Sequence, residues 1–175
     1  KHFFVMAPNL TIYRKVKDDL GNPSNPKYVF RGLDKFVNPP RVIDGDNYND
    51  FRQGTFGVND VVINIFNIAK LNSDSKVSSG SPARIRRLNE VLGESYFAYL
   101  QSLGDLCIFM DESHHYHADK SFDVINELRP ILGVELTATP QIQKGTRKVD
   151  FKNVVYEYTL AHALNDGKYV KVPVV

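Results

Sequence analysis

Residues 106–116, LCIFMDESHHY, join a short apolar run to a polar end. The run from Leu106 to Met110 is typical of a strand buried on both faces of a sheet. Asp111 and Glu112 follow directly, so this strand would deliver two adjacent carboxylates to a sheet edge. Cys107, the single cysteine of the chain, lies inside the run. It excludes an intrachain disulfide, fits a reducing compartment and is expected to be a buried thiol rather than a nucleophile.

Similar apolar runs occur on both sides of this stretch. They predict strands at residues 3–7, 61–66 and 131–136, with a weaker one near 154–156. Apolar residues spaced by three and four predict helices between them, at about 10–20, 84–103, 122–128 and 160–164, with a division of the second into two helices at Gly93 as an alternative. Residues 21–57 and 72–82 are expected to be irregular, because Gly, Pro, Asn, Asp and Ser dominate them. Alternating strands and helices predict an α/β fold, a mostly parallel sheet with flanking helices.

The composition fits one ordinary domain. The chain has 175 residues, 42% of them hydrophobic, which is enough for a core. With 22 basic and 20 acidic residues the net charge is +2, which permits a nucleic-acid partner without requiring one. Polar residues interrupt every apolar stretch well short of the roughly 18 residues that a membrane helix needs. No secretory signal is visible, so we expect a cytoplasmic protein with no membrane partner.

Parallel strands place their chemistry just past their carboxyl ends. Three such places carry polar residues: Pro8-Asn9, Asp111 to His114, and Thr137 to Pro140. In phosphate-hydrolysing motors the first acid after such a strand holds Mg²⁺ through water, and the next polarises the attacking water. Acids after a strand also commonly cap the following helix.

The histidines next to this acidic pair allow another interpretation. His114, His115 and His117 lie close to Asp111 and Asp119 and could ligate a transition metal, as in a metal-dependent hydrolase. Their spacing differs from the one-turn pattern of a helical zinc site, and adjacent histidines on one segment point apart. Exposed loop histidines are the simpler interpretation.

Thr137, Ala138 and Thr139 end the next predicted strand and precede Pro140. Hydroxyl side chains at a strand end can bond a neighbouring carboxylate or histidine, and so connect one site to another. A Ser/Thr turn before a proline is the structural alternative.

These strand ends together resemble a known superfamily. Asp111-Glu112-Ser113-His114 resembles the DExH box of superfamily 2 helicases, and Thr137-Ala138-Thr139 resembles their third motif. Ala7-Pro8-Asn9 resembles the motif that contacts the nucleic-acid backbone. Within the superfamily, residues 93–97, 111–116 and 125–140 are most similar to the motor subunit of type III restriction endonucleases. The resemblance implies a RecA-like lobe of the P-loop NTPase class, with ATP and Mg²⁺ as cofactors.

The resemblance also implies roles for single residues. Asp111 would help to place Mg²⁺ through water, Glu112 would be the general base, and His114 would couple hydrolysis to a second motor lobe. Thr137, Ala138 and Thr139 would link the nucleotide site to the nucleic-acid path. Pro8, Asn9, Phe66 and Asn67 would lie along the DNA backbone.

The sequence departs from the family at one essential element. No Gly-x-x-x-x-Gly-Lys-Ser/Thr loop occurs in it, so the phosphate-binding loop of such motors is missing. We therefore expect residues 1–159 to be a first lobe truncated at its N-terminus, and residues 160–175 to begin the connection to a second lobe. By itself this piece is expected to be inactive.

The whole protein is expected to be an ATP-dependent helicase or translocase on double-stranded DNA, associated with a site-specific endonuclease. A modification methyltransferase subunit would be its partner. A non-catalytic DNA-binding relic of the helicase fold is the alternative. Two basic groups are further candidates for DNA contact, with a solvated face as the simpler interpretation of the first: Arg84, Arg86 and Arg87, and a loop with Lys144, Arg147, Lys148 and Lys152.

Overall fold

The computed structural model describes residues 1–36, 38–48, 60–67, 84–86, 88–89, 94–117, 119–144 and 147–167. The chain divides into two compact units, residues 1–138 and 139–175. The first unit contains the main sheet and the candidate site. The second contains a hairpin and a short helix.

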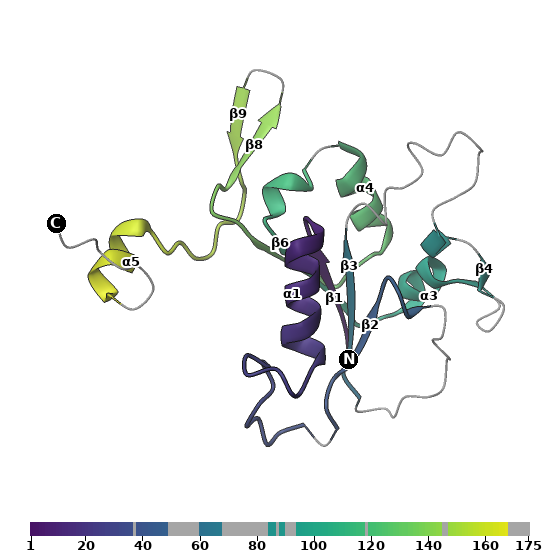
Figure 1. Cartoon of the computed structure of the whole chain (residues 1–175). Helices are drawn as coiled ribbons and strands as arrows, with labels where there is room; N and C mark the ends of the chain where they lie inside the picture. Colours follow the sequence, from purple (N-terminus) through teal and green to yellow (C-terminus); the bar gives the residue numbers. More distant parts are fainter. Residues whose placement is uncertain are drawn as a thin grey trace. The chain divides into compact units, whose positions relative to one another are not determined.

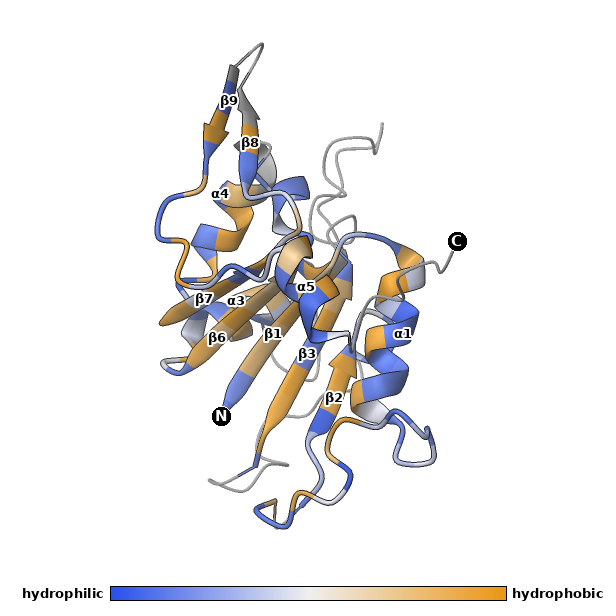
Figure 2. Cartoon of the chain, turned by 90° about the vertical axis from the view of Figure 1, so that its left-hand side faces the viewer, coloured by the Kyte–Doolittle hydropathy of each residue, from blue (hydrophilic) through white to orange (hydrophobic). Residues whose placement is uncertain are grey.

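A five-stranded parallel sheet forms the centre of the first unit. Its strands are β1 (His2–Ala7), β2 (Arg41–Asp44), β3 (Val62–Asn67), β6 (Leu106–Asp111) and β7 (Leu132–Leu136). They lie side by side in the order β2-β3-β1-β6-β7. Figure 1 labels β1, β2, β3 and β6, and Figure 2 shows the whole row together with β7. Every neighbouring pair is parallel. The predicted α/β fold with a mostly parallel sheet is confirmed.

One face of the sheet is covered along β1, β3 and β6, whereas β7 has no buried residue. In β6, Leu106, Ile108 and Met110 point into a core shared with Phe4 and Met6 of β1. Helices α3 (Tyr96–Ser102) and α4 (Asp119–Glu127) complete this core with Tyr96, Phe97, Leu100 and Ile125. The strands are largely hydrophobic along their length (Figure 2), as strands covered by helices require.

The other face is covered only in part, by helix α1 (Leu10–Gly21). The helix begins where the Asn9 side-chain oxygen accepts a hydrogen bond from the Ile12 amide at 2.9 Å, a standard N-cap. Beside the helix an apolar hollow of about 610 Å³ extends along the sheet. Phe3, Val5 and Phe109 line it, and Asp111 lies on its wall. Asp111 therefore belongs to the less covered face of the sheet.

The long helix predicted at 84–103 is wrong in its first half. Residues Arg84–Arg86 form a 3₁₀ turn (η3), and β4 (Leu88–Asn89) pairs antiparallel with β5 (Glu94–Ser95). The helix begins only at Tyr96, where the Ser95 hydroxyl accepts a bond from the Ala98 amide at 3.0 Å. Ile85 is nonetheless buried in the core. The apolar spacing correctly predicts that Ile85 is buried, but a 3₁₀ turn can bury this side chain as well as an α-helix can.

Two further predictions are corrected. The segment 21–57 is expected to be irregular, but it contains the strand β2. The two apolar residues of β2, Val42 and Ile43, are enough to form a strand because β3 pairs with them in parallel. Residues 154–156 form no strand, and Val155 is 95% exposed, since β-branched residues make a strand only when another strand pairs with them. The segments 72–82 and 170–175 lie outside the described residues.

The second unit begins at Thr139. It contains an antiparallel hairpin of β8 (Gln141–Lys144) and β9 (Arg147–Asp150), where the sequence had indicated a loop. Helix α5 (Leu160–Asp166) follows, capped by the Thr159 hydroxyl and ended by Gly167 at φ 61°, as predicted. In the described part of the chain, no helix has the length and apolar content to cross a membrane.

Candidate functional site

The polar strand ends expected from the sequence share one edge of the sheet. Because all strands run the same way, their carboxyl ends meet at that edge. The register pairs Ala7 with Asn67, Met6 with Met110, and Asp111 with Leu136. The residues that follow β1, β6 and β7 therefore begin at the same level of the sheet.

The acidic pair lies at the carboxyl end of β6, between the ends of β1 and β7. Asp111 is half-buried, and its Oδ1 accepts a hydrogen bond from the Glu112 amide at 3.0 Å. Glu112 itself has φ 51°, in the left-handed region that residues other than glycine rarely adopt. Such backbone conformations cost about 1–3 kcal/mol and persist where the surroundings fix them. The turn at Glu112 directs the chain into η4 (Ser113–His115).

A histidine joins this turn to the neighbouring strand end. His114 Nδ1 lies 2.8 Å from Thr137 Oγ1, within hydrogen-bond distance. The same nitrogen is 3.4 Å from Glu112 Oε2. One imidazole thus contacts both the second acid after β6 and the first hydroxyl after β7. Ala138 and Thr139 are exposed, and Thr139 already belongs to the second unit.

A second histidine makes a parallel connection. His117 Nε2 is 2.7 Å from Glu135 Oε2, and its ring stacks on Phe122 with centroids 4.9 Å apart. His114 and His117 therefore hold the loop after β6 to β7 at two separate points. His114 contacts Thr137 and Glu112, while His117 contacts Glu135. A metal centre would need the histidine nitrogens to converge on one point.

The described geometry of His114, His115 and His117 does not support the interpretation as a metal cluster. Within the described ranges, no three His, Cys, Asp or Glu side chains are arranged to hold a metal ion. The His114 and His115 rings lie 4.1 Å apart at their centroids, but the polar contacts of His114 and His117 go to different residues of β7 and its end.

A buried phenol lies under the acidic turn. Burial raises the pKa of Tyr116 far above its ordinary value, and the nearby charges of Asp111 and Glu112 raise it further. Tyr116 therefore stays neutral at any physiological pH. Its side chain is completely buried and belongs to the core on the covered face. Neither Tyr116 nor Glu135 was identified from the sequence, since neither stands at a strand end.

The residues proposed for nucleic acid divide into two groups. Pro8 is half-buried and Asn9 is exposed at the carboxyl edge, where Asn9 also caps α1. Phe66 is fully buried and stacks on Phe4 with centroids 5.4 Å apart, and Asn67 is buried too. The structure therefore gives Phe66 and Asn67 a place in the core, and only Pro8 and Asn9 offer surface.

Arg86 also has a structural role. Its guanidinium lies 3.9 Å from the centre of the Phe97 ring and 2.9 Å from Glu127 Oε2. These contacts fix η3 to α3 and to the end of α4. Arg86 therefore has a packing role, which neither the solvated helix face nor the DNA contact considered from the sequence includes.

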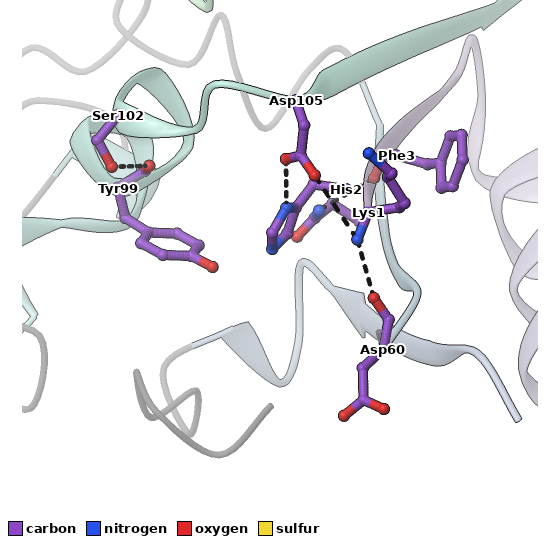
Figure 3. A network of polar contacts seen from close by, with 8 residues as sticks. Lys1, His2, Phe3, Asp60, Tyr99, Ser102 and Asp105 are labelled. Carbon is purple, nitrogen blue, oxygen red and sulfur yellow. Dashed lines mark hydrogen bonds and ion pairs between the residues drawn. The ribbon is translucent and has the colours of Figure 1, made fainter. Parts of the chain in front are cut away.

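The opposite edge of the sheet carries a polar cluster of another kind (Figure 3). His2 Nδ1 at the start of β1 lies 2.6 Å from Asp105 Oδ1, just before β6. Burial raises the pKa of Asp105, but the hydrogen bond and charge of His2, with the charges of Lys1, lower it by more. The net result is a carboxylate with a pKa below its ordinary value. This pair connects two strands far from the acidic turn.

Comparison with known proteins identifies the family. No curated protein matches the chain. A family model described as type III restriction enzyme, res subunit, matches residues 1–142. The matched range includes the whole parallel sheet, the acidic turn and the threonine strand end. It indicates a helicase-like, ATP-dependent DNA enzyme, a family that generally uses ATP and Mg²⁺. The chain belongs to the family of type III restriction enzyme res subunits.

Proposed function

We propose that this chain is part of the first RecA-like lobe of an ATP-dependent DNA translocase, the restriction subunit of a type III restriction–modification enzyme. One observation carries the proposal. The acids after β6 and the threonine after β7 lie at the same sheet edge, and His114 contacts both Glu112 and Thr137. In this proposal residues 1–159 belong to the first lobe and residues 160–175 lead towards a second.

The acidic turn suits a magnesium–nucleotide complex. Asp111 is a half-buried carboxylate on the less covered face, with one oxygen already oriented by the Glu112 amide. Carboxylate oxygens are suitable Mg²⁺ partners, directly or through water. Bound Mg²⁺ would supply charge neutralisation for ATP phosphates. The phosphate loop that completes such a site is absent from these 175 residues and would have to come from elsewhere in the whole protein.

Glu112 is the candidate general base. Its left-handed backbone places it at the start of η4, where its carboxylate is 37% exposed and 3.4 Å from His114. A partly exposed carboxylate can accept a proton from an attacking water molecule. His114 lies between this carboxylate and Thr137, so a change in charge at Glu112 acts directly on the His114–Thr137 contact.

The DNA path in this proposal follows the sheet edge. Pro8 and Asn9 supply surface there, while Thr137, Ala138 and Thr139 connect the nucleotide site to that path. The buried Phe66 and Asn67 support β3 beneath it. Double-stranded DNA is the proposed substrate, a modification methyltransferase subunit the proposed partner, and the cytoplasm the proposed location.

The test is ATP hydrolysis by the full-length protein, with and without duplex DNA, for wild type and Glu112→Gln. Glutamine keeps the size of the side chain but removes the base, so turnover should fall by about 10²–10⁴-fold while ATP still binds. Glu127→Gln is the matched control, since Glu127 pairs with Arg86 away from the site, and it should leave turnover unchanged. Full activity of Glu112→Gln would refute the assignment of the base. A wild-type protein without ATPase activity under any DNA condition would favour the non-catalytic relic.

A further inference from the structure

The second unit concentrates positive charge in one short segment. Residues 141–152 contain four basic side chains and one acidic one, a net charge of +3, whereas the whole chain has +2. The rest of the chain is therefore slightly acidic. The four basic residues are Lys144, Arg147, Lys148 and Lys152.

The hairpin fold arranges these charges unevenly along its length. Gln141 pairs with Asp150 at the base, and Lys144 pairs with Arg147 at the far end. At the base, the Gln141 side-chain amide donates to Asp150 Oδ1 at 3.0 Å, so the only acid of the segment is engaged there. The basic positions 144, 147 and 148 belong to the other half of the hairpin. The acidic residue of the ribbon thus lies at its base, and the basic residues lie in its far half; Figure 1 shows the two paired strands.

The described charged side chains of this segment face solvent, while Ile142 and Phe151 are half-buried. Lys148, Asp150 and Lys152 are exposed, and Val149 is 41% exposed opposite Ile142. Lys148 and Lys152 are therefore accessible to a ligand. Lysine on an exposed strand also hinders edge-to-edge aggregation. The two roles differ in one respect: only a binding site makes DNA affinity depend on these lysines.

We propose that the β8–β9 hairpin, with Lys152 beside it, is a contact site for the phosphate backbone of duplex DNA. This inference rests on the proposed function, because it assigns a second DNA contact to the same motor. Clustered lysine and arginine residues bind phosphates without reading sequence, and each contact releases counterions. Three basic residues belong to β8 and β9, and a fourth, Lys152, follows two residues after β9. Such a density of positive charge suits a polyphosphate chain.

The experiment measures binding of the full-length protein to a labelled duplex, without nucleotide, between 50 and 200 mM salt. Lys148→Gln with Lys152→Gln removes two exposed charges of the site. Lys27→Gln with Lys35→Gln removes two exposed charges from the loop after α1 and is the matched control. Each lost phosphate contact lowers the slope of log affinity against log salt by about 0.9. The affinity ratio of wild type to hairpin variant should therefore shrink about tenfold across this salt range.

A weaker, less salt-dependent hairpin variant beside an unchanged control variant supports the site. Equal losses in both variants would mean that only the total charge matters, and wild-type binding by the hairpin variant would mean that the hairpin is not a contact. Either result overturns the inference. Displacement of DNA by an acidic polypeptide as efficiently as by unlabelled duplex, at equal charge, also overturns it. None of these outcomes depends on ATP hydrolysis, because binding is measured without nucleotide. The result of the Glu112→Gln test of the proposed function is therefore independent of them.

Discussion

Removal of the Thr137 hydroxyl tests whether the contact between the two strand ends has a function. Thr137→Val keeps the shape of the side chain but loses the bond to His114 Nδ1, which is 2.8 Å long in the structure. A hydrogen bond between two partly buried side chains contributes about 0.5–1.5 kcal/mol. If this contact transmits the effect of DNA to the acidic turn, its loss should reduce DNA stimulation of hydrolysis by about two- to tenfold.

The assay compares kcat for ATP with and without duplex DNA in the full-length protein. The ratio of the two values should fall in Thr137→Val, while basal kcat and KM for ATP stay close to wild type. Thr137→Ser retains the hydroxyl and should restore the ratio. A valine variant with the wild-type ratio, or a serine variant as impaired as the valine variant, would refute the coupling argument.

Two further predictions concern stability. Tyr96 donates a short buried hydrogen bond to Asn64 Oδ1, and burial holds the pKa of Tyr96 well above its ordinary value, so the phenol keeps its proton. Because Tyr96→Phe removes the donor and leaves the Asn64 oxygen unsatisfied, it should lower the free energy of unfolding, measured in urea, by about 1–3 kcal/mol. Adding Asn64→Leu should cost less than the sum of the two single changes, and strict additivity would contradict the pairing. The pKa of Asp105 is lowered in the folded state, so its contribution to stability is complete above about pH 4 and is lost as pH falls through the folded value. Asp105→Asn should therefore be less stable than wild type at pH 6, and the difference should shrink by pH 3; a constant difference would exclude the charge of Asp105 as its cause.

The segments predicted correctly share a simple cause. β1, β3, β6 and β7 are runs of apolar residues, and such runs form strands where neighbouring strands pair with them. Helices cover β1, β3 and β6, whereas β7 has no buried residue. Helix α5 was predicted from its apolar spacing and from Gly167, which adopts the left-handed conformation that ends it. In each case the information lies within a few neighbouring residues.

The errors arose where a distant partner decides the structure. Val42 and Ile43 form a strand because β3 pairs with them, whereas Val154 and Val155 form none. Ile85 has helical spacing to its neighbours but is buried from a 3₁₀ turn. The sequence predicts a loop where the β8–β9 hairpin lies, because the two strands are mostly polar and show no alternation of apolar residues.

The sequence by itself determined that two carboxylates and a threonine stand at the ends of apolar strands, because apolar runs and the residues after them are local features. It also determined the family, through the residues at those strand ends. Only the tertiary structure decided which strand ends lie side by side. That order places His114 on Thr137 and His117 on Glu135, and it buries Phe66 in the core. The physical reason is that sheet order and side-chain burial depend on contacts between residues far apart in the chain, which no local pattern encodes.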